Sequence, residues 1–384
     1  MTRWAVVGPT YPFRGGIAHF TTLLVQHLRQ RHPVAFYSFR RQYPSWLFPG
    51  RSDRDPSQTP LTTEVEYVLD PLNPITWFQT FRRIRRFQPD CLVLNWWVPF
   101  WAPAWWTLST LSRRAGIRVL YICHNVLPHE ATLGSRWLAK QVLSRGDDWV
   151  TLSREQARTL EKLLPGRKVV YTPHPTYAPL KRQTLEPATA RAALGLVPQT
   201  PVLLFFGLVR PYKGLSVLLE AMPAVRRATG AVLLVAGEFW EPRQRYEQQI
   251  TALGLQDAVR LVDQYIPDEQ LPLYFGAADV VVLPYLRATQ SGVAQLAHGF
   301  GRPVIASRVG DLEERFVEGE TGLLVPPGDV QALAKAIGRF FQARPVPDPQ
   351  SPLPQHKEQP SWEDLVKVLE RMIMDDKATV CTTL

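Results

Sequence analysis

The stretch 202–214, VLLFFGLVRPYKG, decides the fold class of this chain. It opens as a short, continuously apolar run at 202–207, crosses a loop with two glycines and two cations, and enters an amphipathic stretch at 214–228. Buried apolar strands that alternate with helices are typical of a parallel sheet covered on both faces. We therefore expect an α/β fold in this part of the chain.

The same alternation continues on both sides of this stretch. Downstream, we expect strands at 232–236, 259–262, 279–283, 303–306 and 322–325, and helices at 242–253, 268–276, 292–300 and 329–343. Upstream, we expect strands at 4–8, 34–39, 91–95, 118–123, 149–152 and 168–172, and helices at 17–30, 76–87, 135–144 and 154–164. The two series predict two Rossmann-like domains of one architecture.

The domain boundaries follow from the segments that break the alternation. We predict a first domain at 1–180, a linker within 173–186, and a second domain at 187–344. A proline-rich connector at 345–360 leads to a final helix at 361–376. Ser361 is its expected N-cap. Its expected apolar face holds Trp362, Leu365, Val366, Leu369 and Ile373.

Composition limits the class of protein. The 384 residues are 45% hydrophobic, and the three cysteines are too scattered for a disulfide framework or a zinc site. We find no signal-peptide pattern and no apolar run long enough to cross a membrane, and so we expect a cytoplasmic protein. The net charge of +10 comes from residues 1–180, which predicts an anionic partner for the first half.

Two glycine-containing loops each follow a predicted strand and precede a helix. The first, at 8–18, contains Gly15 and Gly16, which let the backbone approach a phosphate or a sugar. The second contains Gly207, Arg210 and Lys213. Arg210 can grip a phosphate with two hydrogen bonds, and Lys213 adds a point charge. The alternatives are a tight loop without a ligand and a solvated loop.

Two further motifs carry polar chemistry. At 289–293, TQSGV precedes a predicted helix that Ser291 would cap, which turns the N–H groups of Gly292 and Val293 toward a second phosphate. An ordinary capped helix is the alternative. At 123–130, CHNVLPHE follows a strand, and His124 is the residue best placed to contact sugar hydroxyls. A structural histidine is the alternative there.

These elements, in this order, resemble the family 4 glycosyltransferases, a retaining group with the GT-B fold. The resemblance covers residues 1–343 and is strongest in FFGLVRPYKG, GRPVIASRVGDLEE and GETGLLVPPGD. It implies two Rossmann-like domains facing each other across a cleft, with a C-terminal helix that crosses back to the first domain. It also implies a retaining, metal-independent transfer of a sugar, without a cofactor, from a nucleotide-diphosphate-sugar donor.

The resemblance also implies residue roles. Arg210 and Lys213 would neutralise the donor diphosphate, Gly16 would approach the phosphates or the acceptor, and His124 would contact the transferred sugar. The backbone of Tyr265 and Ile266 would meet the base.

The sequence departs from the family at one place. The two glutamates that typically precede the G-x-P-V run fall on Ala288 and Leu296. Thr289, Gln290 and Ser291 are the candidates to supply neutral hydrogen bonds instead, and Glu238 is a further candidate for donor binding. The departure keeps open a non-catalytic protein that binds a nucleotide sugar or scaffolds an assembly. An epimerase acting on the donor sugar is a third reading.

The acceptor side has two basic and aromatic features. Residues 82–86 (RRIRR) share a predicted helix with Trp77 and Phe78, and residues 96–106 hold five of the twelve tryptophans. Both suit peripheral contact of 77–106 with an anionic membrane on its inner face, and we expect a glycan or a lipid-linked molecule as the acceptor. A solvated face, a packed core and an acceptor groove are the alternatives. We find no nucleic-acid module and expect no nucleic acid as partner.

Overall fold

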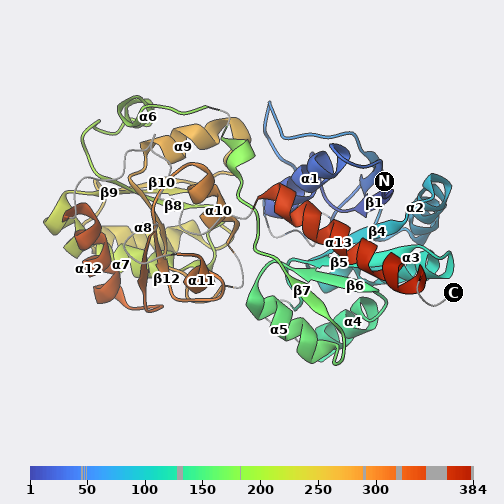
Figure 1. The fold of residues 1–384 in the computed structure, drawn as a ribbon. Helices are drawn as coiled ribbons and strands as arrows, with labels where there is room; N and C mark the ends of the chain where they lie inside the picture. Colours follow the sequence, from blue (N-terminus) through green and yellow to red (C-terminus); the bar gives the residue numbers. More distant parts are fainter. Residues whose placement is uncertain are drawn as a thin grey trace. The chain divides into compact units, whose positions relative to one another are not determined.

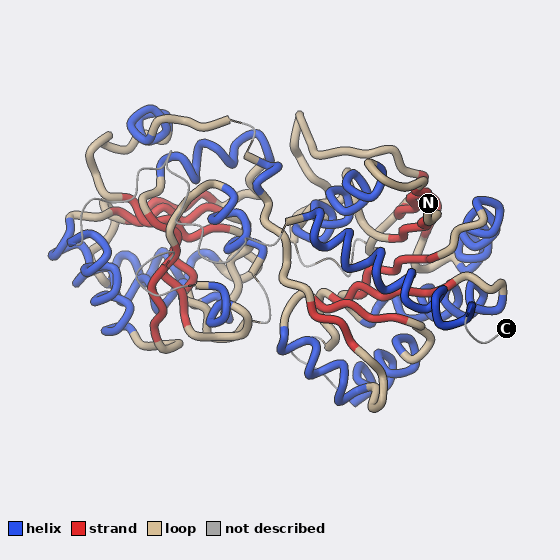
Figure 2. The backbone as a smooth tube through the Cα atoms, in the orientation of Figure 1, coloured by secondary structure: helices blue, strands red, loops and turns tan. Residues whose placement is uncertain are grey.

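The computed structural model describes two compact α/β units. The described residues are 1–44, 46, 48, 50–127, 133–181, 183–288, 291–316, 322–342 and 361–381. The first unit comprises 1–55, 61–175 and 360–384, and the second comprises 56–60 and 176–359. In each unit, helices lie on both sides of one parallel sheet (Figures 1 and 2). The predicted pair of Rossmann-like domains is confirmed, whereas the expected connector at 345–360 lies outside the described residues.

The first unit contains a seven-stranded sheet of order β3-β2-β1-β4-β5-β6-β7. Its strands are β1 (Trp4–Val7), β2 (Val34–Phe39), β3 (Glu66–Leu69), β4 (Cys91–Trp96), β5 (Arg118–Cys123), β6 (Asp148–Thr151) and β7 (Val169–Tyr171). Six of these strands were predicted, and β3 was missed. Strand β3 lies at the sheet edge, and two of its four residues are exposed. Its sequence, EYVL, therefore lacks the continuous apolar run of a buried strand.

The first sheet is covered by six helices of the described chain. They are α1 (Gly16–Arg29), α2 (Pro74–Phe87), α3 (Ala102–Arg114), α4 (Leu133–Leu143), α5 (Arg154–Leu163) and α13 (Trp362–Cys381). Helix α3 was missed because its residues were considered as a tryptophan-rich surface. The structure instead buries four of the five tryptophans of 96–106 in the core, namely Trp96, Trp97, Trp101 and Trp105. For these four, the membrane interpretation was wrong and the packed-core alternative is right.

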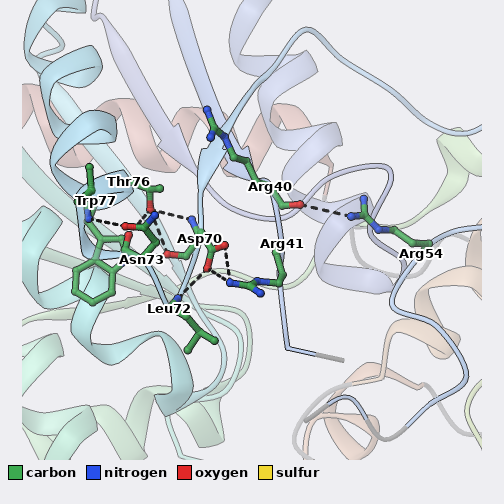
Figure 3. A network of polar contacts seen from close by, with 9 residues as sticks. Arg40, Arg41, Arg54, Asp70, Leu72, Asn73, Thr76 and Trp77 are labelled. Carbon is green, nitrogen blue, oxygen red and sulfur yellow. Dashed lines mark hydrogen bonds and ion pairs between the residues drawn. The ribbon is translucent and has the colours of Figure 1, made fainter. Parts of the chain in front are cut away.

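Helix α2 is fixed at its start by a network of polar contacts (Figure 3). Asn73 caps the helix by accepting a hydrogen bond from the N–H of Ile75. Asp70 accepts two bonds from Arg41, at 2.8 and 2.7 Å, and its carbonyl accepts a bond from Trp77 Nε1. The network holds the first turn of α2 in place.

The final helix, α13, packs onto the first unit beside α1 (Figure 1). Ser361 accepts a hydrogen bond from the N–H of Asp364, as expected for an N-cap. The predicted apolar face is buried throughout. Trp362 lies 5.2 Å from Phe20 and stacks on His27 at 5.7 Å between ring centroids.

Replacing Trp362 by alanine is expected to lower the free energy of unfolding by about 3 kcal/mol, because it empties a buried aromatic site. The change should appear as a lower urea midpoint in circular dichroism. Met374→Ala is the matched control on the same helix, since that side chain is 54% exposed. Equal midpoints for the two variants would show that the packing of Trp362 does not stabilise the unit.

The second unit contains a six-stranded parallel sheet of order β10-β9-β8-β11-β12-β13. The strands are β8 (Val202–Phe206), β9 (Val232–Ala236), β10 (Val259–Val262), β11 (Val280–Leu283), β12 (Val304–Ser307) and β13 (Gly322–Val325). The described helices are α6 (Pro187–Ala193), α7 (Leu215–Thr229), α8 (Arg243–Ala252), α9 (Leu271–Ala277), α10 (Gly292–Gly299), α11 (Leu312–Arg315) and α12 (Val330–Gln342). All six strands were predicted, and the short helices α6 and α11 were missed.

None of the helices in the described part of the chain is both long and apolar enough to span a bilayer.

Candidate functional site

The loop between β8 and α7 holds the predicted phosphate-binding cations. It leaves the strand at Gly207, whose φ of 89° is left-handed and favours glycine. A Cβ at this position would lie 3.3 Å from Lys213 Nζ and 3.2 Å from Val293 Cγ2. Gly207 therefore brings the Lys213 ammonium close to the start of α10.

Lys213 is a buried cation. Only 9% of the residue is exposed, and its Nζ lies 5.7 Å from the centroid of the Tyr285 ring. Burial, with a smaller contribution from the positive charge of Arg210, lowers the pKa of Lys213 to about 8. Within the described residues, no carboxylate forms an ion pair with Lys213 or with Arg210.

Arg210 lies over an aromatic ring in the adjacent loop. Its guanidinium carbon is 4.4 Å from the centroid of Trp240, in cation–π contact. Trp240 Nε1 donates to Glu238 Oε1 at 3.1 Å, and Glu238 is buried. In the structure, Glu238 thus helps to orient the ring that supports Arg210.

Helix α10 begins opposite these loops. The Ser291 hydroxyl caps it by accepting a hydrogen bond from the N–H of Ala294 at 3.2 Å, which confirms the predicted N-cap. Gly292 at the first helical position is exposed, and Val293 is half-buried. Thr289 and Gln290, which were candidates for donor binding, lie outside the described residues.

The strand order explains why these loops meet. Strand β8 lies between β9 and β11, and the chain runs outward from β8 on one side and from β11 on the other. The loops after β8 and β11 therefore flank the topological switch point, where open parallel sheets bind ligands. Tyr265 and Ile266 follow the edge strand β10, and Ile266 is buried. Strand β9 lies between β10 and β8 in the sheet.

The first unit has its own switch point, between β1 and β4. Helix α1 begins there at Gly16, which is exposed, after Gly15 with a φ of 109°. Gly8 follows β1 directly, and a Cβ on it would lie 2.6 Å from the side-chain nitrogen of Asn95, near the end of β4. The tight approach of β1 to Asn95 thus requires a glycine at position 8.

His124 follows β5 and is buried beside Asn95. Its Nε2 lies 3.0 Å from Asn95 Oδ1, and its ring meets that of Phe20 edge-to-face at 4.8 Å. Burial, with a smaller contribution from His174, lowers the pKa of His124 to about 3. The imidazole is therefore neutral at pH 7. With Nε2 assigned as the donor to Asn95, Nδ1 is left as an acceptor.

The buried His124 predicts a pH dependence of stability. Its folded pKa of about 3 lies below the unfolded value near 6.5, so the unfolded chain binds an extra proton between these pH values. Stability should therefore fall as pH drops from about 6.5 toward 3. In His124→Gln this loss should be smaller than in the wild type, as measured by urea midpoints at pH 7 and pH 5.

His129, the other histidine of this motif, lies outside the described residues.

The same midpoints in His27→Gln provide the control, because His27 lies on α1 and is only half-buried. If the pH dependence of His124→Gln matches that of the wild type, another group carries the acid sensitivity.

Sequence reasoning missed three residues of these arrangements. Trp240 supports Arg210, Tyr285 faces Lys213, and Asn95 pairs with His124. Asn95 carried a readable signal, because it is a polar residue at the end of an otherwise apolar strand. Trp240 and Tyr285 carried none, since an aromatic residue after a strand is common in any core.

Family models match both halves of the chain. Residues 14–178 match the model for "Glycosyltransferase Family 4", and residues 200–343 match the model for "Glycosyl transferases group 1". These two ranges contain Gly15, Gly16 and His124 in the first and Arg210, Lys213 and Ser291 in the second.

Individual relatives agree with the family models. The chain is 33% identical over 213 residues to a D-inositol 3-phosphate glycosyltransferase of Nocardia farcinica, a match to 53% of this chain and 47% of that relative. It is 37% identical over 162 residues to the enzyme of that name from Saccharomonospora viridis, a match to 40% and 37% of the two chains. In these matches, the chain spans about half the length of the relatives or less.

Solved structures share the fold over the whole chain. Sucrose-phosphate synthase from Thermosynechococcus elongatus superposes with a TM-score of 0.72 at 21% identity, covering 99% of this chain and 100% of that one. Anabaena HepE in complex with UDP-glucose superposes with a TM-score of 0.68 at 18% identity, with full coverage of both chains. The solved structures show that the fold is GT-B, and the two family models, which together match most of the chain, show that it belongs to the glycosyltransferases.

Proposed function

We propose that the chain transfers a sugar from a nucleotide-diphosphate-sugar donor to a glycan or lipid-linked acceptor. The observation that carries the proposal is the pair of cations after β8. A buried ammonium without a carboxylate partner is unfavourable, and a bound anion relieves that cost. Lys213, Arg210 and the start of α10 offer two positive charges and helix N–H groups, which match a pyrophosphate.

The proposed chemistry is the departure of a nucleoside diphosphate. As the bond between the anomeric carbon and the phosphate oxygen breaks, negative charge grows on the phosphate oxygens. Lys213 and Arg210 stabilise that charge in the transition state, and the N-terminus of α10 adds its dipole. This accounts for a transfer without a resident metal or cofactor. Retention at the anomeric carbon and roles for Gly15, Gly16, Gly207, His124, Tyr265 and Ile266 remain predictions of the family resemblance.

The acceptor side of the proposal rests on α2. Its Arg82, Arg83, Arg85 and Arg86 are exposed, as are Ile75 and Phe78 near its start. A helix with exposed basic and apolar residues suits an anionic membrane surface, which supports a lipid-linked acceptor and a place on the inner face of the membrane.

The experiment that tests the proposal measures product formation by purified protein. HepE was solved with UDP-glucose, so UDP-sugars are the first donors to test, followed by GDP-, ADP- and dTDP-sugars. We expect release of the nucleoside diphosphate, by hydrolysis or by transfer, from at least one donor. Ala288 and Leu296, in place of the family's glutamates, favour the alternative of a non-catalytic binder. Tight binding of a donor without turnover would establish that alternative, and interconversion of the donor sugar would indicate an epimerase.

A further inference from the structure

A large cavity in the first unit runs along β2 and is lined by more arginines than carboxylates. Its volume is about 980 Å³, and its floor includes Ala35 and Tyr37 of β2, with α2 forming a wall. Among the described residues, a single carboxylate, that of Glu66, lines it. The arginines that line it come from three parts of the chain and are Arg3, Arg40, Arg82, Arg83 and Arg86. We call this space the arginine cavity.

Three of these arginines have partners within the protein. Arg83 forms an ion pair with Glu66 at 2.8 Å. Arg3 donates to the carbonyl of Phe87 at 2.6 Å, at the end of α2, and Arg40 donates to the carbonyl of Tyr67 at 3.3 Å. A carbonyl fixes a guanidinium in place without neutralising its charge, so Arg3 and Arg40 remain positive toward the cavity.

The other two arginines have no hydrogen-bond or ion-pair partner among the described residues. Arg82 and Arg86 lie one turn apart on the exposed face of α2. Like charges at this spacing destabilise a helix, although the helix dipole partly compensates near its C-terminus. A bound anion would remove this repulsion.

We propose that the arginine cavity binds a ligand that carries several phosphate groups. Guanidinium groups match phosphate oxygens with paired hydrogen bonds, and several of them converge here. The cavity is larger than one phosphate requires, which favours a multiply phosphorylated molecule or headgroup. The site is separate from the cations after β8, which belong to the second unit, and does not depend on the proposed donor chemistry. It shares Arg82, Arg83 and Arg86 with the surface proposed for membrane contact.

The wall of this site is fixed before any ligand binds. Asn73 caps α2, and Asp70 is held by Arg41 at the start of the same helix (Figure 3). At the other end, Arg3 holds the last turn through the carbonyl of Phe87. A helix anchored at both ends holds the backbone of Arg82 and Arg86 in place before binding, so only their side chains have to be ordered by the ligand.

The test is a titration of the full chain with three soluble probes and one membrane probe. The soluble probes are inorganic phosphate, pyrophosphate and inositol hexakisphosphate. Their binding is measured by calorimetry. The membrane probe is a phosphatidylcholine vesicle with or without phosphatidylinositol 4,5-bisphosphate, because Ile75 and Phe78 are exposed on α2, which forms the cavity wall. We expect affinity to rise with the number of phosphates and to weaken with salt. A soluble ligand is indicated if inositol hexakisphosphate binds, and a lipid headgroup if only anionic vesicles bind.

The decisive comparison uses two double variants of equal charge. Arg82→Gln/Arg86→Gln should weaken binding by about a hundredfold, the loss of two charge-assisted contacts. Arg114→Gln/Arg158→Gln removes the same charge from exposed residues of α3 and α5 that do not line the arginine cavity, and should change affinity little. Because all four side chains are exposed, both variants should fold, as circular dichroism will check. Equal losses in the two variants, or no binding of any probe, would overturn the proposal.

Discussion

Replacing Lys213 by alanine is expected to lower kcat/KM for sugar transfer by about a thousandfold, a loss typical of removing one group that stabilises transition-state charge. The expectation rests on position, because Lys213 is buried, faces Tyr285 and has no carboxylate partner among the described residues. A buried cation acts in a medium of low dielectric constant, where its attraction for a departing diphosphate is strong. Steady-state kinetics with the donor found in the screen measures the effect.

The control is Lys335→Ala, which removes an exposed lysine of α12 in the same unit. Its activity should equal that of the wild type. If Lys213→Ala retains full activity, the assignment of this loop to catalysis is wrong.

A pH profile separates the charge of Lys213 from its bulk. Because its pKa is lowered to about 8, the side chain loses its proton as the pH rises through that value. Since kcat/KM reports the free enzyme, it should fall above about pH 8 in the wild type. In Lys213→Arg the fall should disappear from the activity that remains, because a guanidinium stays charged.

Replacing Gly214 by alanine is expected to destabilise the second unit by about 4 kcal/mol or more, through both backbone strain and a clash. Gly214 has a φ of 70°, and a Cβ built on it would lie 2.0 Å from the carbonyl oxygen of Pro284. The loop would have to move away from the segment after β11. That movement also displaces Lys213, the preceding residue, so activity should be lost together with stability.

The chain offers a matched control at the other end of α7. Gly230 has a φ of 68°, and a Cβ there would meet nothing within 4 Å. Gly230→Ala therefore carries only the left-handed strain, about 1 kcal/mol. Urea unfolding of both variants measures the difference. Equal stabilities would show that only the left-handed backbone conformation requires Gly214, and that the close approach to Pro284 adds no cost.

The sequence predicted most of the fold because the buried strands are continuously apolar. Strand β3 escaped prediction since it is a half-exposed edge strand, and α3 escaped because its buried tryptophans resembled a membrane-facing surface. Helical spacing alone cannot say whether the partner of an aromatic face is a sheet or a lipid.

The candidate site was predictable where chemistry and position coincide. Arg210 and Lys213 follow a strand and precede a helix, so their place at the carboxyl end of the sheet follows from local sequence. The burial of His124 against Asn95 depends on which strands are neighbours, and the strand order β1-β4-β5 cannot be read from either residue. The support of Arg210 by Trp240 likewise depends on the pairing of β8 with β9.

The most direct test compares the affinities of a nucleoside diphosphate and the corresponding monophosphate, by calorimetry, in the wild type and in Arg210→Ala/Lys213→Ala. The panel covers uridine, guanosine, adenosine and thymidine nucleotides, because the base is not known. The account predicts that the wild type prefers the diphosphate and that the double variant loses this preference. A preference that survives in the double variant would place the pyrophosphate elsewhere and contradict the account.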